Sequence, residues 1–254
     1  MAIETYLHEH QVFTSEEFNN EFPSSRTDRN LLQRAVSRGK VSRPHRGLYV
    51  SRTGRFEGTD ANPFDVVAAL DPQAVFVYAS ALQLHGGEHN VLRRVQFAGS
   101  RRWSTFSHAG VMFECYPMRS DNTLTRRRSS DTGRTLTFTT REQTLIDCLE
   151  NIDRAAGPEN LLRSISSWRR LDVHAATELA LSASRSTSAR FGWLLTARAS
   201  QWHPGAEDLH ALHTHAGAGP YYFQPSDRST SHWDKDWSLY LPRQKEELSA
   251  WMAA

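Results

Sequence analysis

Residues 26–51 read RTDRNLLQRAVSRGKVSRPHRGLYVS, and this stretch decides how the first part of the chain folds. Its first half places Leu31, Leu32, Ala35 and Val36 at helical spacing, which predicts one side of a helix that packs against other elements. Gly39 suits the left-handed position that ends such a helix. Beyond it, two runs rich in β-branched and aromatic residues flank a turn in which a glycine can adopt a positive φ. The stretch therefore predicts a helix followed by a β-hairpin.

Two shorter helices are expected upstream of this stretch. One covers residues 3–9, and a capping box of Thr14 and Glu17 opens the second. Ser25 with Asp28 forms a further box of the same kind, which opens the third helix. Three helices and then a hairpin are the layout of a winged helix-turn-helix module, whose third helix enters the major groove of DNA.

The charge of the first 55 residues is strongly polarised. Residues 1–25 contain five glutamates and no lysine or arginine, whereas residues 26–55 contain nine lysines or arginines and one acid, Asp28. Such polarity within one small unit favours a surface that faces a polyanion. The alternative for the third helix taken alone is a solvated charged face.

Nine polar residues of this segment have expected roles in DNA binding. Because arginine can bond guanine and asparagine or glutamine can bond adenine, base recognition is expected of Arg26, Arg29, Asn30 and Gln33. Contact with DNA phosphates, from the helix end and the wing, is expected of Arg34, Arg38, Lys40, Arg43 and Arg46. Tyr49 is expected to pack in the core, as strand aromatics usually do.

The remainder of the chain predicts a second domain. The winged helix is expected to span residues 1–55 and a larger mixed α/β domain residues 62–254, with a glycine-containing linker between them. Asn62 is expected to cap a helix that starts at Pro63. The expected helices beyond it cover residues 80–85, 141–151, 158–168, 172–183 and 188–200, and the expected strands cover 91–97, 111–116, 135–138, 221–224 and 237–241. Without regular βαβ alternation, the fold class is α+β.

Composition narrows the class of protein further. No run approaches the roughly 18 apolar residues of a membrane span, and the chain does not begin with the layout of a signal peptide, so a cytoplasmic protein with no membrane partner is expected. The two cysteines, Cys115 and Cys148, form no CxxC pair and are expected to be buried as small apolar residues.

Several segments, in order along nearly the whole chain, resemble the AbiEi-type antitoxins of abortive-infection toxin-antitoxin systems. These are Phe13–Glu17, Arg38–Arg43 and Arg46–Val50 in the winged helix, and then Ser80–Gly86, Arg141–Asp147 and Arg190–Leu195. The resemblance implies a repressor that binds inverted repeats in the promoter of its own operon, with a carboxy-terminal domain responsible for antitoxicity. It also implies a nucleotidyltransferase-type toxin as the partner. Trp233–Asp236 departs from the family pattern.

Three groups of residues suggest other kinds of chemistry. A zinc site at His203, His210, His213 and His215 lacks a nearby thiolate and is the weaker alternative to a polar helix end and loop. A metal-dependent nuclease would draw on Asp234, Lys235 and Asp236, but a charged surface turn is favoured there. A hydrolase triad of Ser80, His85 and Asp147 lacks the G-x-S-x-G turn.

The sequence accordingly predicts a protein with no catalytic residues, no metal and no cofactor, in which Arg126–Arg128 belong to a solvated loop. Two alternatives remain open. One is a protein-interaction module that binds the toxin with little DNA binding, and the other is the metal-dependent nuclease.

Overall fold

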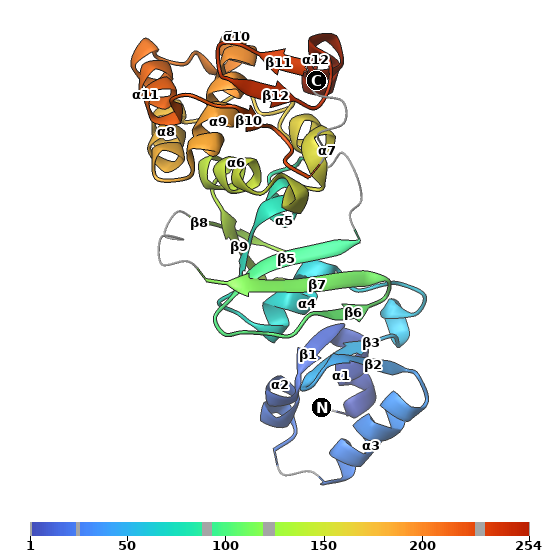
Figure 1. Ribbon diagram of the computed structural model, residues 1–254. Helices are drawn as coiled ribbons and strands as arrows, with labels where there is room; N and C mark the ends of the chain where they lie inside the picture. Colours follow the sequence, from blue (N-terminus) through green and yellow to red (C-terminus); the bar gives the residue numbers. More distant parts are fainter. Residues whose placement is uncertain (1, 24–25, 88–92, 119–124, 227–231, 254) are drawn as a thin grey trace. The chain divides into compact units, whose positions relative to one another are not determined.

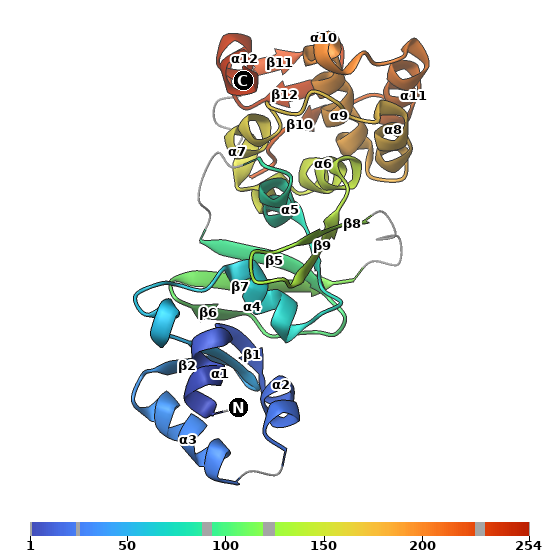
Figure 2. The same ribbon diagram turned by 180° about the vertical axis from the view of Figure 1, so that it is seen from behind.

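The computed structural model describes residues 2–23, 26–87, 93–118, 125–226 and 232–253 (Figures 1 and 2). The chain divides into two compact units. Unit 1 comprises residues 1–76, 93–120 and 127–137, and unit 2 comprises residues 77–92, 121–126 and 138–254. Helices and strands are mixed without βαβ alternation, which confirms the α+β fold class.

The first 51 residues form three helices and a small sheet in unit 1. Their order is α1 (Ile3–Glu9), β1 (Val12–Thr14), α2 (Ser15–Glu21), α3 (Arg26–Ser37), β2 (Val41–His45) and β3 (Leu48–Ser51). The sheet is antiparallel, and β3 lies between β1 and β2. This is the topology of a winged helix, with the one unpredicted element, β1, supplying the edge strand.

Turn and cap residues adopt the local structure that the sequence predicts. The Thr14 hydroxyl accepts a hydrogen bond from the Glu17 amide at 3.1 Å, and the Glu17 carboxylate accepts one from the Thr14 amide at 2.7 Å, which confirms the capping box. Gly39 and Gly47 have φ of 71° and 80°, as their turns require. The second predicted box involves Ser25, which lies outside the described residues.

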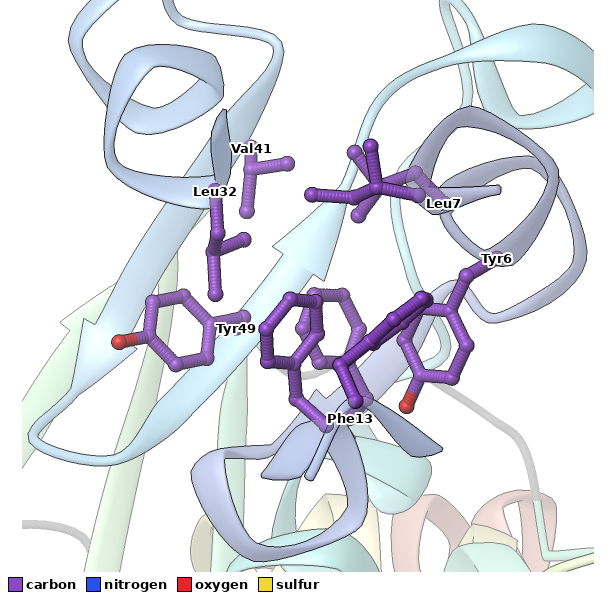
Figure 3. Close-up of a cluster of buried hydrophobic side chains, with 9 residues drawn as sticks. Tyr6, Leu7, Phe13, Leu32, Val41 and Tyr49 are labelled. Atoms are coloured by element: carbon purple, nitrogen blue, oxygen red, sulfur yellow. The ribbon is translucent and has the colours of Figure 1, made fainter. Parts of the chain in front are cut away.

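The winged helix has its own hydrophobic core, drawn in Figure 3. Tyr49 is 5% exposed and its ring stacks on Phe13 with centroids 5.5 Å apart, so its predicted packing role is confirmed. Leu32 from α3 is also buried there. The prediction that Leu31 packs inward is wrong, because its side chain is 36% exposed. Leu31 lies at the edge of the helix face that Leu32 centres, since a helix advances about 100° per residue.

The rest of unit 1 is built around a six-stranded sheet. A short 3-10 helix η1 (Gly54–Phe56) leads to α4 (Pro63–Leu70), where the Asn62 side chain accepts a hydrogen bond from the Phe64 amide at 3.0 Å, as predicted for a cap. The sheet order is β6-β7-β5-β4-β9-β8. Its strands are β4 (Val75–Phe76), β5 (Arg94–Gly99), β6 (Phe106–His108), β7 (Val111–Pro117), β8 (Thr125–Ser129) and β9 (Thr135–Thr139).

Two features of this sheet correct the sequence analysis. Arg126–Arg128 lie in β8 and not in a loop, and all three are exposed. Three arginines on a strand at the sheet edge discourage pairing with another chain, because charged side chains oppose edge-to-edge association. Cys115, expected to be buried, is half-buried on β7.

Unit 2 is mainly helical. Its helices are α5 (Tyr78–Leu84), α6 (Arg141–Glu150), η2 (Ile152–Ala155), α7 (Gly157–Ser164), α8 (Val173–Leu181), α9 (Arg185–Ala197), α10 (Ala199–Trp202), α11 (Ala206–Ala216) and α12 (Lys245–Met252). A three-stranded sheet of order β10-β12-β11 adds β10 (Tyr221–Tyr222), β11 (His232–Asp234) and β12 (Leu239–Leu241). The helix predicted to reach residue 168 ends at Ser164, and the strand predicted over 221–224 covers two residues. Cys148 is fully buried, as expected, and burial raises the pKa of its thiol.

Residues outside the first 55 contact the winged helix within unit 1. Arg134, between β8 and β9, donates hydrogen bonds to the Val12 carbonyl at 2.7 Å and to the Glu17 carboxylate at 3.1 Å. His45, on β2, packs its ring against Trp103 and Phe106 with centroids 5.4 Å away in each case. The expected boundary between residues 55 and 62 therefore falls inside unit 1, and independent folding of residues 1–55 stays a prediction.

No helix in the described ranges combines the length and the apolar character that crossing a membrane requires.

Candidate nucleic-acid interface

Helix α3 presents three faces, because successive residues are rotated by about 100° around its axis. The inner face carries Leu32 and packs in the winged-helix core. The outer face carries Arg26, Asn30 and Gln33, all exposed. The third face, here called the flank, carries Leu31 and Arg34 and continues to Arg38 after the helix ends. The sequence analysis places Leu31 with the inner face, so it does not reveal the flank as a separate face.

Arg29 lies on the side of α3 that faces α2. Its Nε donates a hydrogen bond to the Asn19 side-chain oxygen at 3.2 Å, so this arginine ties the two helices together while remaining exposed. Of the four residues expected to recognise bases, Arg29 is therefore the one whose side chain bonds another residue within the described ranges. Sequence reasoning missed Asn19, which lies on a helix with no basic residue.

The five residues expected to contact phosphates are all exposed but lie in two groups. Arg34, Arg38 and Lys40 line a cavity that residues of α1 also line. Arg43 and Arg46 lie on the β2–β3 hairpin, where the Arg43 guanidinium sits 5.9 Å from the centre of the Tyr49 ring.

Most of these cations have no acidic partner. Within the residues that the structure describes, no ion pair or hydrogen bond is made by the side chains of five cations, Arg26, Arg34, Arg38, Lys40 and Arg46. Exposed cations without internal partners can form contacts with an external anion without first breaking an existing pair.

The hairpin is short and its tip is anchored. The Gly47 carbonyl accepts a hydrogen bond from the Ser15 amide at 2.8 Å, at the start of α2. On the other side, His45 packs on Trp103 and Phe106. The wing therefore holds Arg46 close to the body of unit 1 instead of on a long projecting loop. No local sequence signal marks these anchors, because Trp103 and Phe106 are distant in the chain.

The acidic helix α2 is partly neutralised within unit 1. Arg134 lies 3.1 Å from Glu17, and their side chains are 22% and 43% exposed. An exposed pair of this kind contributes little to stability, about 0–1 kcal/mol. It does reduce the negative charge of α2, which lies next to the cationic helix α3 in the chain. Sequence reasoning missed Arg134 because it is 117 residues from Glu17.

The competing sites do not assemble. In the described part of the chain, no group of three or more histidine, cysteine or acidic side chains could hold a metal ion. Two of the four candidate histidines bond separate partners, His213 the Asp236 carbonyl and His215 the Ser188 hydroxyl.

The residues of the other two candidate sites have structural contacts. Asp234 ends β11, is buried, and accepts a hydrogen bond from the Trp237 amide at 3.1 Å, so the expected charged surface turn covers Lys235 and Asp236 but not Asp234. His85 hydrogen-bonds the Thr139 carbonyl at 2.8 Å, whereas Asp147 accepts from Gln143 at 2.8 Å. Each of these two residues of the rejected triad therefore has a partner outside the triad.

Comparisons with known proteins bear on the fold. No family model matches the chain, and no curated protein matches it. Among solved structures, the crystal structure of the RV2827C protein from Mycobacterium tuberculosis is similar, with a TM-score of 0.68 over 98% of this chain and 91% of that one. The two sequences are 14% identical, so this likeness concerns the fold alone.

Proposed function

We propose that this chain is a DNA-binding transcriptional repressor that binds inverted repeats in the promoter of its own operon and acts as the antitoxin of an abortive-infection toxin-antitoxin system. The observation that carries the DNA-binding part is the set of exposed cations on α3 and the wing of a winged-helix topology, whose side chains have no ion-pair partner among the described residues. Duplex DNA is the polyanion whose groove accepts a helix of this size.

The roles within this surface differ by position. Asn30 and Gln33, on the outer face, have the amides that bond adenine. Lys40 and Arg46 lie outside the helix and suit phosphates, which fix register but carry no sequence information. The antitoxin part of the proposal is supported by the resemblance of the segments 80–86, 141–147 and 190–195 to the AbiEi family.

Fluorescence anisotropy of the full chain with duplex DNA tests the first part. The probe is a labelled duplex from directly upstream of the chain's own gene, and a scrambled duplex of equal composition serves as the reference. Lys40→Ala and Arg46→Ala are each expected to weaken binding to both duplexes and to reduce the slope of log K against log salt by about one.

Arg170→Ala is the matched control, because Arg170 is an equally exposed cation in unit 2. It is expected to leave the affinity and the salt slope unchanged. Equal effects of Lys40→Ala and Arg170→Ala would contradict the assigned surface, and absence of binding at about 50 mM salt would overturn the DNA-binding proposal.

Coexpression tests the antitoxin part. The product of the adjacent gene is expressed alone or with this chain, and growth is expected to stop in the first case and recover in the second. A variant with both Lys40→Ala and Arg46→Ala should still restore growth when expressed from an unrelated promoter. An adjacent gene that encodes no nucleotidyltransferase, or growth arrest that persists, would contradict the antitoxin role.

A protein-interaction module with little DNA binding is the second candidate, and an aromatic row in unit 2 favours it. Tyr222, Tyr240 and Trp233 face each other across three neighbouring strands, with ring centroids 4.9 and 4.7 Å apart. Trp233 is 41% exposed. Exposed tryptophan and tyrosine are enriched where proteins bind one another. Copurification of the adjacent gene product that is lost in Trp233→Ala, with no DNA binding, would select this candidate.

A further inference from the structure

A cavity of about 430 Å³ lies within unit 1 between α1, the flank of α3 and the segment that follows β3. This volume falls within the range of about 300–1,000 Å³ in which proteins bind small molecules. All of its lining residues lie between positions 3 and 57, so it belongs entirely to the winged helix and the turn beyond it.

One part of the cavity is apolar. Ile3 and Leu7 from α1 line it with side chains 8% and 5% exposed, and Leu31 from α3 adds a side chain that is 36% exposed. A leucine turned away from the core is costly to leave in water, by about 25 cal/mol for each Å² of apolar surface. An apolar group bound in this cavity would cover the Leu31 side chain and remove its exposed surface from water.

The other part of the cavity is cationic. Arg34, Arg38, Lys40 and Arg52 line it, and none of the four has an ion-pair partner in the described ranges. Glu4 and Glu57 are the acids in the lining. The lining thus carries an excess of two positive charges, which matches the charge of one dianion. The guanidinium group of arginine can also donate two parallel hydrogen bonds to the oxygens of a phosphate group.

The segment that follows β3 forms another wall of the cavity and is hydrogen-bonded to α1. The Leu7 carbonyl accepts hydrogen bonds from Ser51 Oγ at 2.7 Å and from Thr53 Oγ1 at 3.3 Å. Gly54 has a φ of 60°, and a Cβ at this position would lie 2.7 Å from His8 Cγ. The turn is therefore closely packed on α1, and a wall fixed in this way needs little reordering when a molecule binds against it.

We propose that this cavity binds a small phosphate monoester with an apolar, aromatic-sized body, with the phosphate among Arg34, Arg38, Lys40 and Arg52 and the body against Leu31, Ile3 and Leu7. Because three of these cations are those expected to contact DNA phosphates, an occupied cavity competes with DNA for them. Binding of the small molecule stands on the cavity alone, whereas its effect on DNA binding rests on the proposed function.

Methyl NMR of the full chain tests the site without DNA, with phenyl phosphate as the probe. Phenyl phosphate is expected to shift the methyl signals of Leu31 and Leu7 saturably, with a dissociation constant below about 1 mM. Inorganic phosphate lacks the apolar body, and benzyl alcohol lacks the phosphate group. Both are expected to bind at least about tenfold more weakly than phenyl phosphate. No saturable shift, or equal binding of inorganic phosphate, would overturn the proposal.

Paired variants locate the phosphate group. Arg38→Ala and Lys40→Ala are each expected to weaken phenyl phosphate binding about tenfold, because each removes one charge-assisted contact. Arg26→Ala removes an exposed cation from the outer face of α3 and is expected to leave the affinity for phenyl phosphate unchanged. Equal losses in all three variants would mean that general charge, not the cavity, attracts the probe, and would overturn the assignment.

A DNA titration then tests whether the small molecule weakens DNA binding, and it distinguishes failure of the cavity proposal from failure of the DNA-binding proposal. Saturating phenyl phosphate is expected to weaken DNA binding about tenfold more than inorganic phosphate does at equal ionic strength. If Leu31 shifts with duplex DNA but not with phenyl phosphate, the cavity is part of a DNA groove and this inference fails while the proposed function stands. If phenyl phosphate binds but DNA never does, the proposed function fails and the small-molecule site stands.

Discussion

Asn30 and Gln33 lie one turn apart on the outer face of α3, and neither makes a side-chain hydrogen bond to another described residue. Asn30→Ala and Gln33→Ala are each expected to reduce discrimination between the promoter duplex and its scrambled form by about 1–3 kcal/mol at one base position. The salt dependence should stay unchanged, because no phosphate contact is removed. Anisotropy with single-base variants of the duplex measures this, and an equal loss on both duplexes would contradict base recognition.

Two half-buried histidines are expected to make the stability of the protein depend on pH. Burial lowers the pKa of His85 in unit 2 and of His108 in unit 1 below their ordinary value of 6.5. The unfolded chain therefore binds protons more readily than the folded chain between the lowered pKa and 6.5. This contribution to stability is complete above that range and is lost as the pH falls through it.

The expected result is a lower urea midpoint at about pH 5.5 than at about pH 7.5. His85→Gln, which keeps a donor for the Thr139 carbonyl, should reduce this difference. His210→Gln is the control, because His210 is exposed. An unchanged difference in His85→Gln would show that His85 is not a source of the pH dependence.

Residues that act on their own backbone could be predicted from the sequence, and residues that act across the fold could not. Thr14, Gly47 and Asn62 shape turns and caps within a few positions of themselves, so their roles follow from local rules. Arg134 acts on Glu17 through the packing of a distant strand pair. Leu31 was placed wrongly because helical spacing does not reveal how wide the buried face is.

At the scale of the element, Gly192 in the middle of α9 illustrates how packing reverses an intrinsic preference. Alanine is about 1 kcal/mol more favourable than glycine in a helix interior. A Cβ on Gly192 would, however, overlap the ring of Trp237, which is 7% exposed and whose indole nitrogen donates to Thr196 Oγ1 at 3.2 Å. Gly192→Ala is therefore expected to destabilise the protein by about 1–3 kcal/mol in urea unfolding.

A second substitution makes this prediction specific. Trp237→Leu added to Gly192→Ala should recover part of the loss, since the smaller side chain leaves room for the methyl group. If Gly192→Ala stabilises the protein, or if the two losses simply add, the close approach of α9 to Trp237 does not limit this position.

Most long helices and strands followed from their hydrophobic patterns, but the helices α11 and α12, of 11 and 8 residues, were not predicted, and neither were the shortest strands. Strands β1, β4 and β11 are two or three residues long, which is too short for an alternating pattern. Strand β8 carries three consecutive arginines, so its composition indicates a loop while its pairing in the sheet makes it a strand. Edge strands escape composition rules because their outward side chains serve to prevent pairing.

At the scale of the whole molecule, the limits of the winged helix can be tested by truncation. Residues 1–60 contain the complete core drawn in Figure 3, and they are expected to give a dispersed NMR spectrum and to bind DNA in dilute salt. Their stability should be several kcal/mol below that of the full chain, because so short a chain buries little surface. An unfolded fragment would show that the boundary between residues 55 and 62 is not a folding boundary.

The full-chain variant Arg134→Ala separates the contribution of the Arg134 contacts with Val12 and Glu17 from that of chain length. It is expected to cost about 1–2 kcal/mol, chiefly from the hydrogen bond to the Val12 carbonyl. A loss as large as that of truncation would mean that this one side chain holds the winged helix in its folded form.

Unit 1 is assembled from three separate stretches of chain, and this has a consequence for how the protein is made. During synthesis, Ser51 leaves the ribosome about eighty residues before Arg134, which is a delay of several seconds at about 5–20 residues per second. The cationic helix and hairpin are thus completed while the strands that later clamp them are still being translated. A newly made chain accordingly passes through a stage in which its positively charged end is finished before the scaffold beneath it exists.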